Sequence, residues 1–194
     1  MVAQANQQDK PEGEVHTMGI DQALRNVGVA FNHNGEVRAV LVQDGGRRGV
    51  DRLRWLRDAV VEIVVAQKPT VVALEAFSFG STHRGRDLAG ILDVLVVAIE
   101  DAGFPTLQVP PKSLKKFVTG SGAASKERMI KGVEGKWGFR TGNDNIADAV
   151  GLAKFAEVYL TERSRYRSEL EAVRDFKAPA TKKKLTFKKE RMAI

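Results

Sequence analysis

The sequence predicts an α/β fold: a mixed sheet, in which an antiparallel meander is followed by parallel strands, with helices on its faces. Three strand-like segments follow one another near the N-terminus, and Asn34-Gly35, a strong hairpin signal, separates the second from the third. After residue 50 the chain alternates helical periodicity with short apolar runs. That alternation is typical of parallel strands joined by helices.

The strands of the meander are expected at residues 15–21, 26–32 and 36–43, followed by a loop at 44–49. In residues 51–67 the apolar side chains adopt a helical period, and Pro69 ends that helix. Residues 70–77, TVVALEAF, form a short apolar run rich in β-branched residues, which predicts a central parallel strand.

The rest of the chain predicts one more strand and several helices. They are expected, in order, as a loop at 78–87, a helix at about 88–102, a strand at 105–111, a helical turn, a loop and a helix within 112–138, and a long helix that begins near residue 143.

Positive charge is concentrated at the C-terminus. The 194 residues carry a net charge of +7, but seven Lys and Arg and one Glu lie from Lys177 onward, so the body is nearly neutral. Such a basic run suggests contact with nucleic-acid phosphates, although a solvated end explains it equally well. We expect a disordered leader (residues 1–14), one domain (15–168) and a basic C-terminal tail (169–194).

Composition excludes several classes of site. The chain has no cysteine, which rules out disulfides and thiolate zinc sites and suits a reducing cytoplasm. No apolar run approaches the roughly 20 residues that span a bilayer, so we expect no membrane partner.

Four acidic residues occupy places where an ionised group is costly. Asp21 ends the first expected strand, and Glu75 lies within or at the end of the central one. Asp144 and Asp148 are four residues apart near the start of the last helix, so they can share one helix face. Adjacent carboxylates repel one another, and a hard cation such as Mg²⁺ removes that penalty. Two such ions about 3.5–4 Å apart would form a clamp for phosphoryl transfer.

Some of these acids also have a purely structural explanation. Asp21 could bond its own backbone in a turn, and Asp144 could cap the helix. Glu75 is harder to explain in this way, because a buried strand seldom tolerates an unpaired glutamate. Asp148 lies close to the apolar face of its helix and is well placed for a site.

The Gly/Ser stretch GSGAASKE invites comparison with a nucleotide-binding P-loop. That motif requires Gly-Lys followed by Ser or Thr, whereas here Ser125 precedes Lys126 and Glu127 follows it. We therefore exclude nucleotide binding at this loop. Its glycines could instead let the backbone approach DNA phosphates.

Four stretches, MGIDQALRNVGVAF, VVALEAFSFG, TGSGAASKERM and DNIADAVGLAKFA, resemble in order and spacing the RuvC family of Holliday junction resolvases, over about residues 15–160. The resemblance implies an RNase H-like fold. It matches Asp21, Glu75 and Asp148 to three family acids that bind two Mg²⁺ ions, with Mn²⁺ as the alternative ion. It further implies cuts that leave 5′-phosphate and 3′-hydroxyl ends, and a homodimer with one active site at each of two symmetric strands.

The sequence departs from the family at the fourth metal ligand. The family has its third and fourth ligands three residues apart, but the residue three before Asp148 is the amide Asn145. We expect Asp144 to take this role, because a charged ligand neutralises the metal better. Coordination through the carbonyl of Asn145 is the alternative.

Further residues are candidates for contact with DNA. Lys115 and Lys126 stand eleven residues apart, as the basic pair of the family does, and the second could also stabilise charge at the scissile phosphate. The position of the family's aromatic wedge holds a serine here, between Phe77 and Phe79; either phenylalanine could stack on a base or pack in the core. Weaker candidates for phosphate contact, in the following loop, are Arg84 and Arg86.

Together these features predict a metal-dependent, structure-selective endonuclease for four-way DNA junctions, with forks and flaps as further candidate substrates. The short chain and basic tail resemble a phage-encoded relative, so we expect the protein in the cytoplasm of a bacterium or an infected cell. A non-catalytic protein that binds branched DNA is the alternative, to which Asn145 points. An actin-like or sugar-kinase phosphotransferase also begins with a GID strand but requires a second similar domain, of which no copy is visible.

Overall fold

The computed structural model describes residues 14–23, 26–77 and 84–178, and for residues 84–87 the backbone alone. The strands are β1 (His16–Gln22), β2 (Asn26–His33), β3 (Glu36–Gln43), β4 (Val71–Glu75) and β5 (Thr106–Val109). The helices are α1 (Gly49–Gln67), α2 (Arg84–Asp101), α3 (Pro111–Thr119), α4 (Lys126–Trp137), α5 (Asp144–Thr161) and α6 (Arg167–Lys177). None of these helices is long and apolar enough to cross a bilayer.

The five strands form one mixed sheet in the order β3-β2-β1-β4-β5. The meander β1-β2-β3 is antiparallel, while β4 runs parallel to both β1 and β5, which confirms the predicted fold class. Asn34 and Gly35 form the turn between β2 and β3, and their φ angles of 50° and 93° are those of a two-residue hairpin turn.

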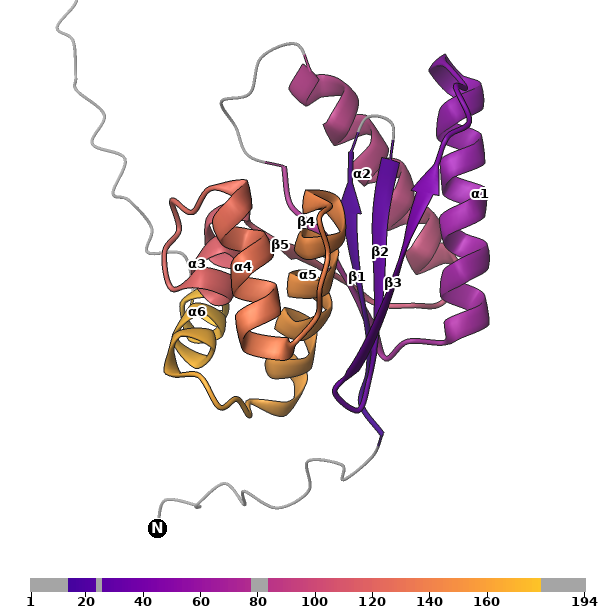
Figure 1. Cartoon of the computed structure of the whole chain (residues 1–194). Coiled ribbons are helices and arrows are strands. Elements are labelled where there is room, and N and C mark those ends of the chain that lie inside the picture. Colours follow the sequence, from indigo (N-terminus) through magenta and orange to yellow (C-terminus); the bar gives the residue numbers. More distant parts are fainter. Residues whose placement is uncertain (1–13, 24–25, 78–83, 179–194) are drawn as a thin grey trace, which may run out of the picture.

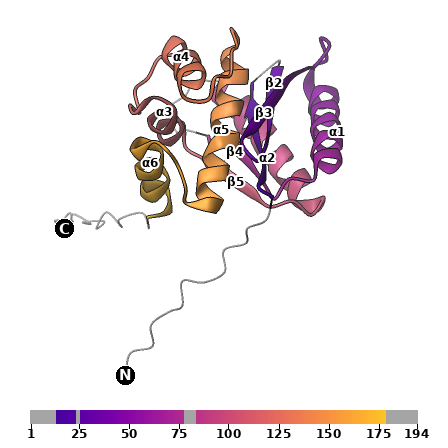
Figure 2. The same cartoon turned by 60° about the horizontal axis from the view of Figure 1, so that its bottom comes forward.

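Helices cover both faces of the sheet (Figures 1 and 2). One face packs on α1 and α2, and the other on α5, with α3, α4 and α6 further out. Successive side chains of a strand point to opposite faces, so Met18 and Ile20 belong to the α1/α2 core while Gly19 faces α5. Asp21 is two residues after Gly19 in β1, so its side chain also points toward α5.

Two glycines allow α5 to lie very close to the sheet. A Cβ atom added at Gly19 would come within 2.0 Å of the Ala149 carbonyl oxygen, and one added at Gly28 within 2.2 Å of the Asn145 carbonyl oxygen. Both neighbours are backbone atoms, so no side-chain rearrangement could make room. Any larger residue at these positions must displace the helix.

A buried polar network holds the middle of α5 in place. The Thr17 hydroxyl donates to the Ala153 carbonyl (2.8 Å) and accepts from the Asn32 amide (3.2 Å). Lys154 in turn donates to the Asn32 side-chain oxygen (2.9 Å) and to the Gly35 carbonyl (3.0 Å). These bonds satisfy polar groups that would be costly to bury alone, and they fix the rotation of α5 about its axis.

The structure differs from the sequence prediction at two helices. The helix expected at about 88–102 begins earlier, at Arg84, so part of the predicted 78–87 loop is helical. The sequence patterns do not predict the helix α6, which extends across the expected boundary at residue 168 into the expected tail. Its Ala172 and Val173 are buried, and Phe176 packs edge-on against Phe155. The segment is short and rich in charged residues, so its few apolar residues do not form a clear helical pattern in the sequence. Tertiary contacts of these residues stabilise the helix.

We expect Gly19→Ala to lower the free energy of unfolding by about 1–3 kcal/mol, because the added methyl group overpacks the contact with α5. Gly135→Ala in α4 is a suitable control, since its Cβ would meet nothing within 4 Å. The control should be neutral or stabilising by up to about 1 kcal/mol. Urea unfolding measures the stability of each variant. Equal free energies of unfolding for the two variants would contradict the close packing of α5.

Candidate active site

Strand register brings two acids together at one edge of the sheet. The parallel pairing of β1 with β4 aligns Ile20 with Leu74, so Asp21 and Glu75 follow at the adjacent strand ends. The side chains of both acids are on the face of the sheet that packs against α5. The side chain of Gln22 donates a 2.6 Å hydrogen bond to the Glu75 carbonyl oxygen and so ties the two strand ends together. Gln22 is not among the residues predicted from the sequence, in which its only signal is its place beside Asp21.

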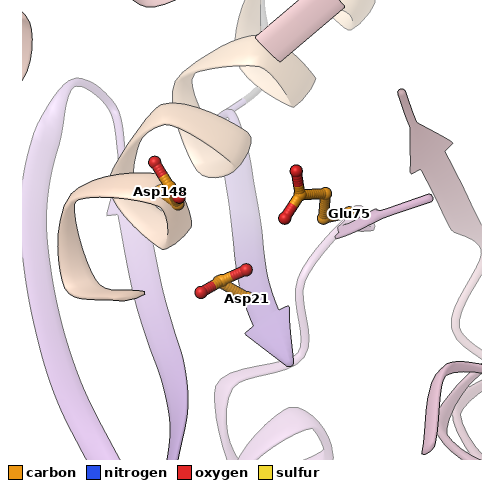
Figure 3. A group of neighbouring side chains, drawn as sticks. All are labelled: Asp21, Glu75 and Asp148. Atoms are coloured by element: carbon orange, nitrogen blue, oxygen red, sulfur yellow. The ribbon is translucent and has the colours of Figure 1, made fainter. Parts of the chain in front are cut away.

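The helix α5 adds the third acid. Its N-cap is Asn143, whose side-chain oxygen accepts from the backbone N–H of Ile146 (3.1 Å). One turn later Asp148 lies on the helix beside Asp21 and Glu75 (Figure 3). Single carboxylate oxygens of the three residues lie within 4.8 Å of one another. The structure thus assembles Asp21, Glu75 and Asp148 from three elements far apart in the chain.

The three carboxylates are held where charge is unfavourable. Burial raises the pKa of Asp21 well above its usual value, and the nearby Glu75 and Asp148 raise it further. Burial also raises the pKa of Glu75, which Asp21 and Lys115 partly offset. The pKa of Asp148 rises to about 7, again mainly through burial and then through Glu75 and Asp144. At neutral pH these groups therefore favour protons or a cation.

The donor set fits a hard divalent cation. It consists of carboxylate oxygens alone, which Mg²⁺ prefers. One oxygen of Asp148, Oδ1, is buried without a hydrogen-bond partner among the described residues. A buried carboxylate oxygen without a partner is costly, and a bound cation would satisfy it.

Asp144 lies beside this group but is engaged elsewhere. It is the first residue of α5, and its carboxylate accepts a hydrogen bond from Lys126 Nζ. This ion pair lowers the pKa of Asp144 and raises that of Lys126. The capping role considered for Asp144 belongs to Asn143. A ligand role for Asp144 or for Asn145 stays a prediction.

The two predicted lysines approach the acids from α3 and α4. Lys115 is close enough to lower the pKa of both Glu75 and Asp148. Lys126 is the first residue of α4, directly after the N-cap Ser125, and its side chain is 77% exposed. Both cations therefore flank the carboxylates, with Lys126 on the solvent side.

The aromatic and arginine candidates are placed only in part. Phe77 is partly buried and packs against the α1/α2 core, in keeping with a structural role. Phe79 lies outside the described residues. Arg84 and Arg86 belong to the first turns of α2, although their side chains are not described.

Comparison with protein families gives a match over most of the chain. Residues 17–154 match the model of the family described as crossover junction endodeoxyribonuclease RuvC. A protein of that name from Anaeromyxobacter sp. (strain Fw109-5) is 29% identical over 143 residues, which cover 70% of this chain and 69% of the relative. Its counterpart from Synechococcus sp. (strain WH7803) is 26% identical, over 73% of this chain and 86% of the relative.

Solved structures show the same fold. The structure of Thermus thermophilus RuvC matches with a TM-score of 0.59 and 24% identity, covering 72% of this chain and 91% of that one. The T. thermophilus protein in complex with a Holliday junction substrate matches with a TM-score of 0.60 and 23% identity, covering 72% and 90%.

We expect the metal-free protein to lose stability as the pH rises from about 4 to about 7. A raised carboxyl pKa means that the folded state binds the proton more tightly than the unfolded chain, so the free energy of unfolding falls as that proton leaves. Asp148→Asn should flatten this dependence and stabilise the protein at pH 8 by on the order of 2 kcal/mol. Urea unfolding in EDTA measures both effects.

The control for this experiment is Asp93→Asn, which changes an exposed aspartate on α2 and should leave the pH dependence as it is. Saturating Mg²⁺ should remove most of the advantage of Asp148→Asn, because the cation relieves the same repulsion. If Asp148→Asn is less stable than the parent at pH 8 in EDTA, the carboxylates do not repel one another as inferred.

Proposed function

The chain belongs to the RuvC family of crossover junction endodeoxyribonucleases, and we propose from this premise that it cleaves Holliday junctions as a metal-dependent endonuclease. The observation that carries the proposal is the convergence of three carboxylates, one buried and two partly buried, from β1, β4 and α5. Acids facing DNA would repel its phosphates unless they held cations. The same geometry therefore disfavours a protein that only binds DNA.

Asp21, Glu75 and Asp148 would hold the metal, with Mg²⁺ as the expected ion and Mn²⁺ as the alternative. Bound divalent cations supply an acidic water molecule and stabilise charge on the leaving oxygen. Asp21, the most deeply buried of the three, has both Glu75 and Asp148 as neighbours and so would share the metal with each of them. Asp144 would complete the set by exchanging its bond to Lys126 for a metal contact.

Lys126 would then be released toward the substrate. Its ammonium group, exposed and within reach of the acids, can bind the scissile phosphate and stabilise the charge that develops there. Lys115 would contact a neighbouring phosphate. Cleavage in this arrangement leaves 5′-phosphate and 3′-hydroxyl ends.

The substrate is expected to be recognised by shape. The related T. thermophilus protein has been solved with a Holliday junction substrate. A four-way junction offers two symmetric strands, so we propose that two copies of the chain act together, one site on each strand. The exposed Val97 on α2 makes this helix a candidate contact between copies. Forks and flaps are further candidate substrates within a bacterial or phage-infected cytoplasm.

We expect Mg²⁺-dependent cutting of a synthetic four-way junction that stops in EDTA. Asp21→Asn should reduce cutting by at least about 100-fold while still binding the junction, because it removes a metal ligand and leaves the DNA surface intact. Gel assays with junction, fork, flap and linear duplex measure the preference. Cutting that is indifferent to the chelator, or normal cutting by Asp21→Asn, would refute the proposal.

We expect a chain ending at Ala178 to bind junctions more weakly. The segment removed carries six Lys or Arg and one Glu. For every phosphate that the shortened chain leaves unneutralised, the slope of log affinity against log salt should become shallower by about 0.9. A tail of the same composition in scrambled order should restore binding, because this attraction does not depend on sequence. An unchanged salt slope after truncation would mean that the tail does not touch DNA.

A further inference from the structure

We propose that the corner where β3 leads into α1 is a second DNA-binding surface, which holds a duplex arm beyond the catalytic carboxylates. This inference rests on the proposed function and extends it to a surface to which none of the predicted site residues belongs. We call this surface the arginine corner. It consists of Arg47, Arg48, Arg52, Arg54 and Arg57.

The arginine corner lies at the same edge of the sheet as the acids. Strands β1 and β3 both run antiparallel to β2, so both end at this edge. Figure 1 shows the start of α1 at the same end of the molecule as the end of β1. The two strand ends are separated by two strand spacings, about 10 Å. A duplex that reaches the acids can therefore pass the corner.

Most of the positive charge of the arginine corner is not neutralised by nearby acids. Arg48 is exposed and has no side-chain hydrogen bond or ion pair within the described part of the chain. Arg54 approaches Asp51 only to 4.0 Å, whereas Arg57 pairs closely with Asp58 (2.7 Å). Exposed pairs of this kind contribute little and exchange readily for a phosphate.

Arg52 adds a further guanidinium to the arginine corner. It lies four residues before Leu56, on the stripe of α1 that faces the sheet. Its Nε atom is buried and has no hydrogen-bond partner among the residues described. A buried, unpaired N–H of this kind is a cost to the fold, and a phosphate could approach only the other N–H groups of this guanidinium.

Arg47 is already ordered for binding. Its guanidinium carbon stacks 4.6 Å from the ring centroid of Trp55, and Nη1 donates to the Asp44 carbonyl oxygen (2.8 Å). The Asp44 carboxylate, itself buried, accepts from the Gly46 N–H (2.9 Å) and so shapes the loop. The remaining N–H groups of Arg47 are free for a phosphate, and binding costs little side-chain entropy because the group is fixed.

The arginine corner complements the two lysines of the active site. Lys115 and Lys126 come from α3 and α4, on the α5 side of the sheet, whereas the corner belongs to α1 on the other side. Cations on both sides of the carboxylates would fix the direction in which a duplex crosses the site. A linear phosphate backbone, rather than a small anion, matches this spread of charge.

The test is the double variant Arg47→Gln/Arg48→Gln, measured by junction binding across a salt series and by cleavage kinetics. The salt slope should become shallower by about 1.8, the value for two phosphates that are no longer neutralised, and affinity should fall several-fold at low salt. Cleavage at saturating junction should keep its rate, so that KM rises while kcat does not. Arg47→Lys/Arg48→Lys should retain the parental slope because it keeps both charges.

The matched control is Arg163→Gln/Arg165→Gln, which removes two exposed arginines after the far end of α5. Its salt slope should equal that of the parent. If the Arg47/Arg48 variant also keeps the parental slope while the parent cuts junctions, the arginine corner is refuted and the proposed function stands. If the parent cuts no branched DNA at any Mg²⁺ or Mn²⁺ concentration, the proposed function fails first.

Discussion

The contact on which the site depends is the close approach of α5 to β1 and β2. Gly19 and Gly28 leave no Cβ between helix and sheet, so backbone meets backbone. The short separation of helix and sheet allows Asp148, one turn into α5, to reach Asp21 and Glu75 at the strand ends. The Thr17–Asn32–Lys154 network then sets the rotation of the helix. A helix resting on ordinary side chains would hold its acid too far from the other two.

This packing places like charges together at a cost to stability. Burial raises the pKa of each of the three acids, and repulsion from neighbouring carboxylates raises those of Asp21 and Asp148 further; Lys115 offsets part of the cost at Glu75 and Asp148. The extensive cores on both sides of the sheet supply the stability that tolerates it. A site of this kind is poised to bind cations, because the metal relieves a repulsion that the fold already contains. The repulsion that a bound cation would relieve is the same one that is expected to destabilise the metal-free site.

Residues around the acids have separate roles. Lys126 and Asp144 pair with each other beside the three acids, while Gln22 joins the ends of β1 and β4 by a side-chain hydrogen bond beyond the last backbone pair. Basic residues stand on both sides of the sheet edge. Lys115 and Lys126 therefore approach the carboxylates from two different helices, α3 and α4.

The sequence by itself determined the order and type of most elements, because valine-rich runs, Asn34-Gly35 and helical periodicity are local properties. It also marked Asp21, Glu75 and Asp148, which the structure brings together, as candidate site residues, since acids beside apolar runs are conspicuous. Only the tertiary structure decided that α6 packs on the domain, that Asn143 and not Asp144 caps α5, and that Lys126 pairs with Asp144. These outcomes depend on distances between segments far apart in the chain, and local patterns carry no information about such distances.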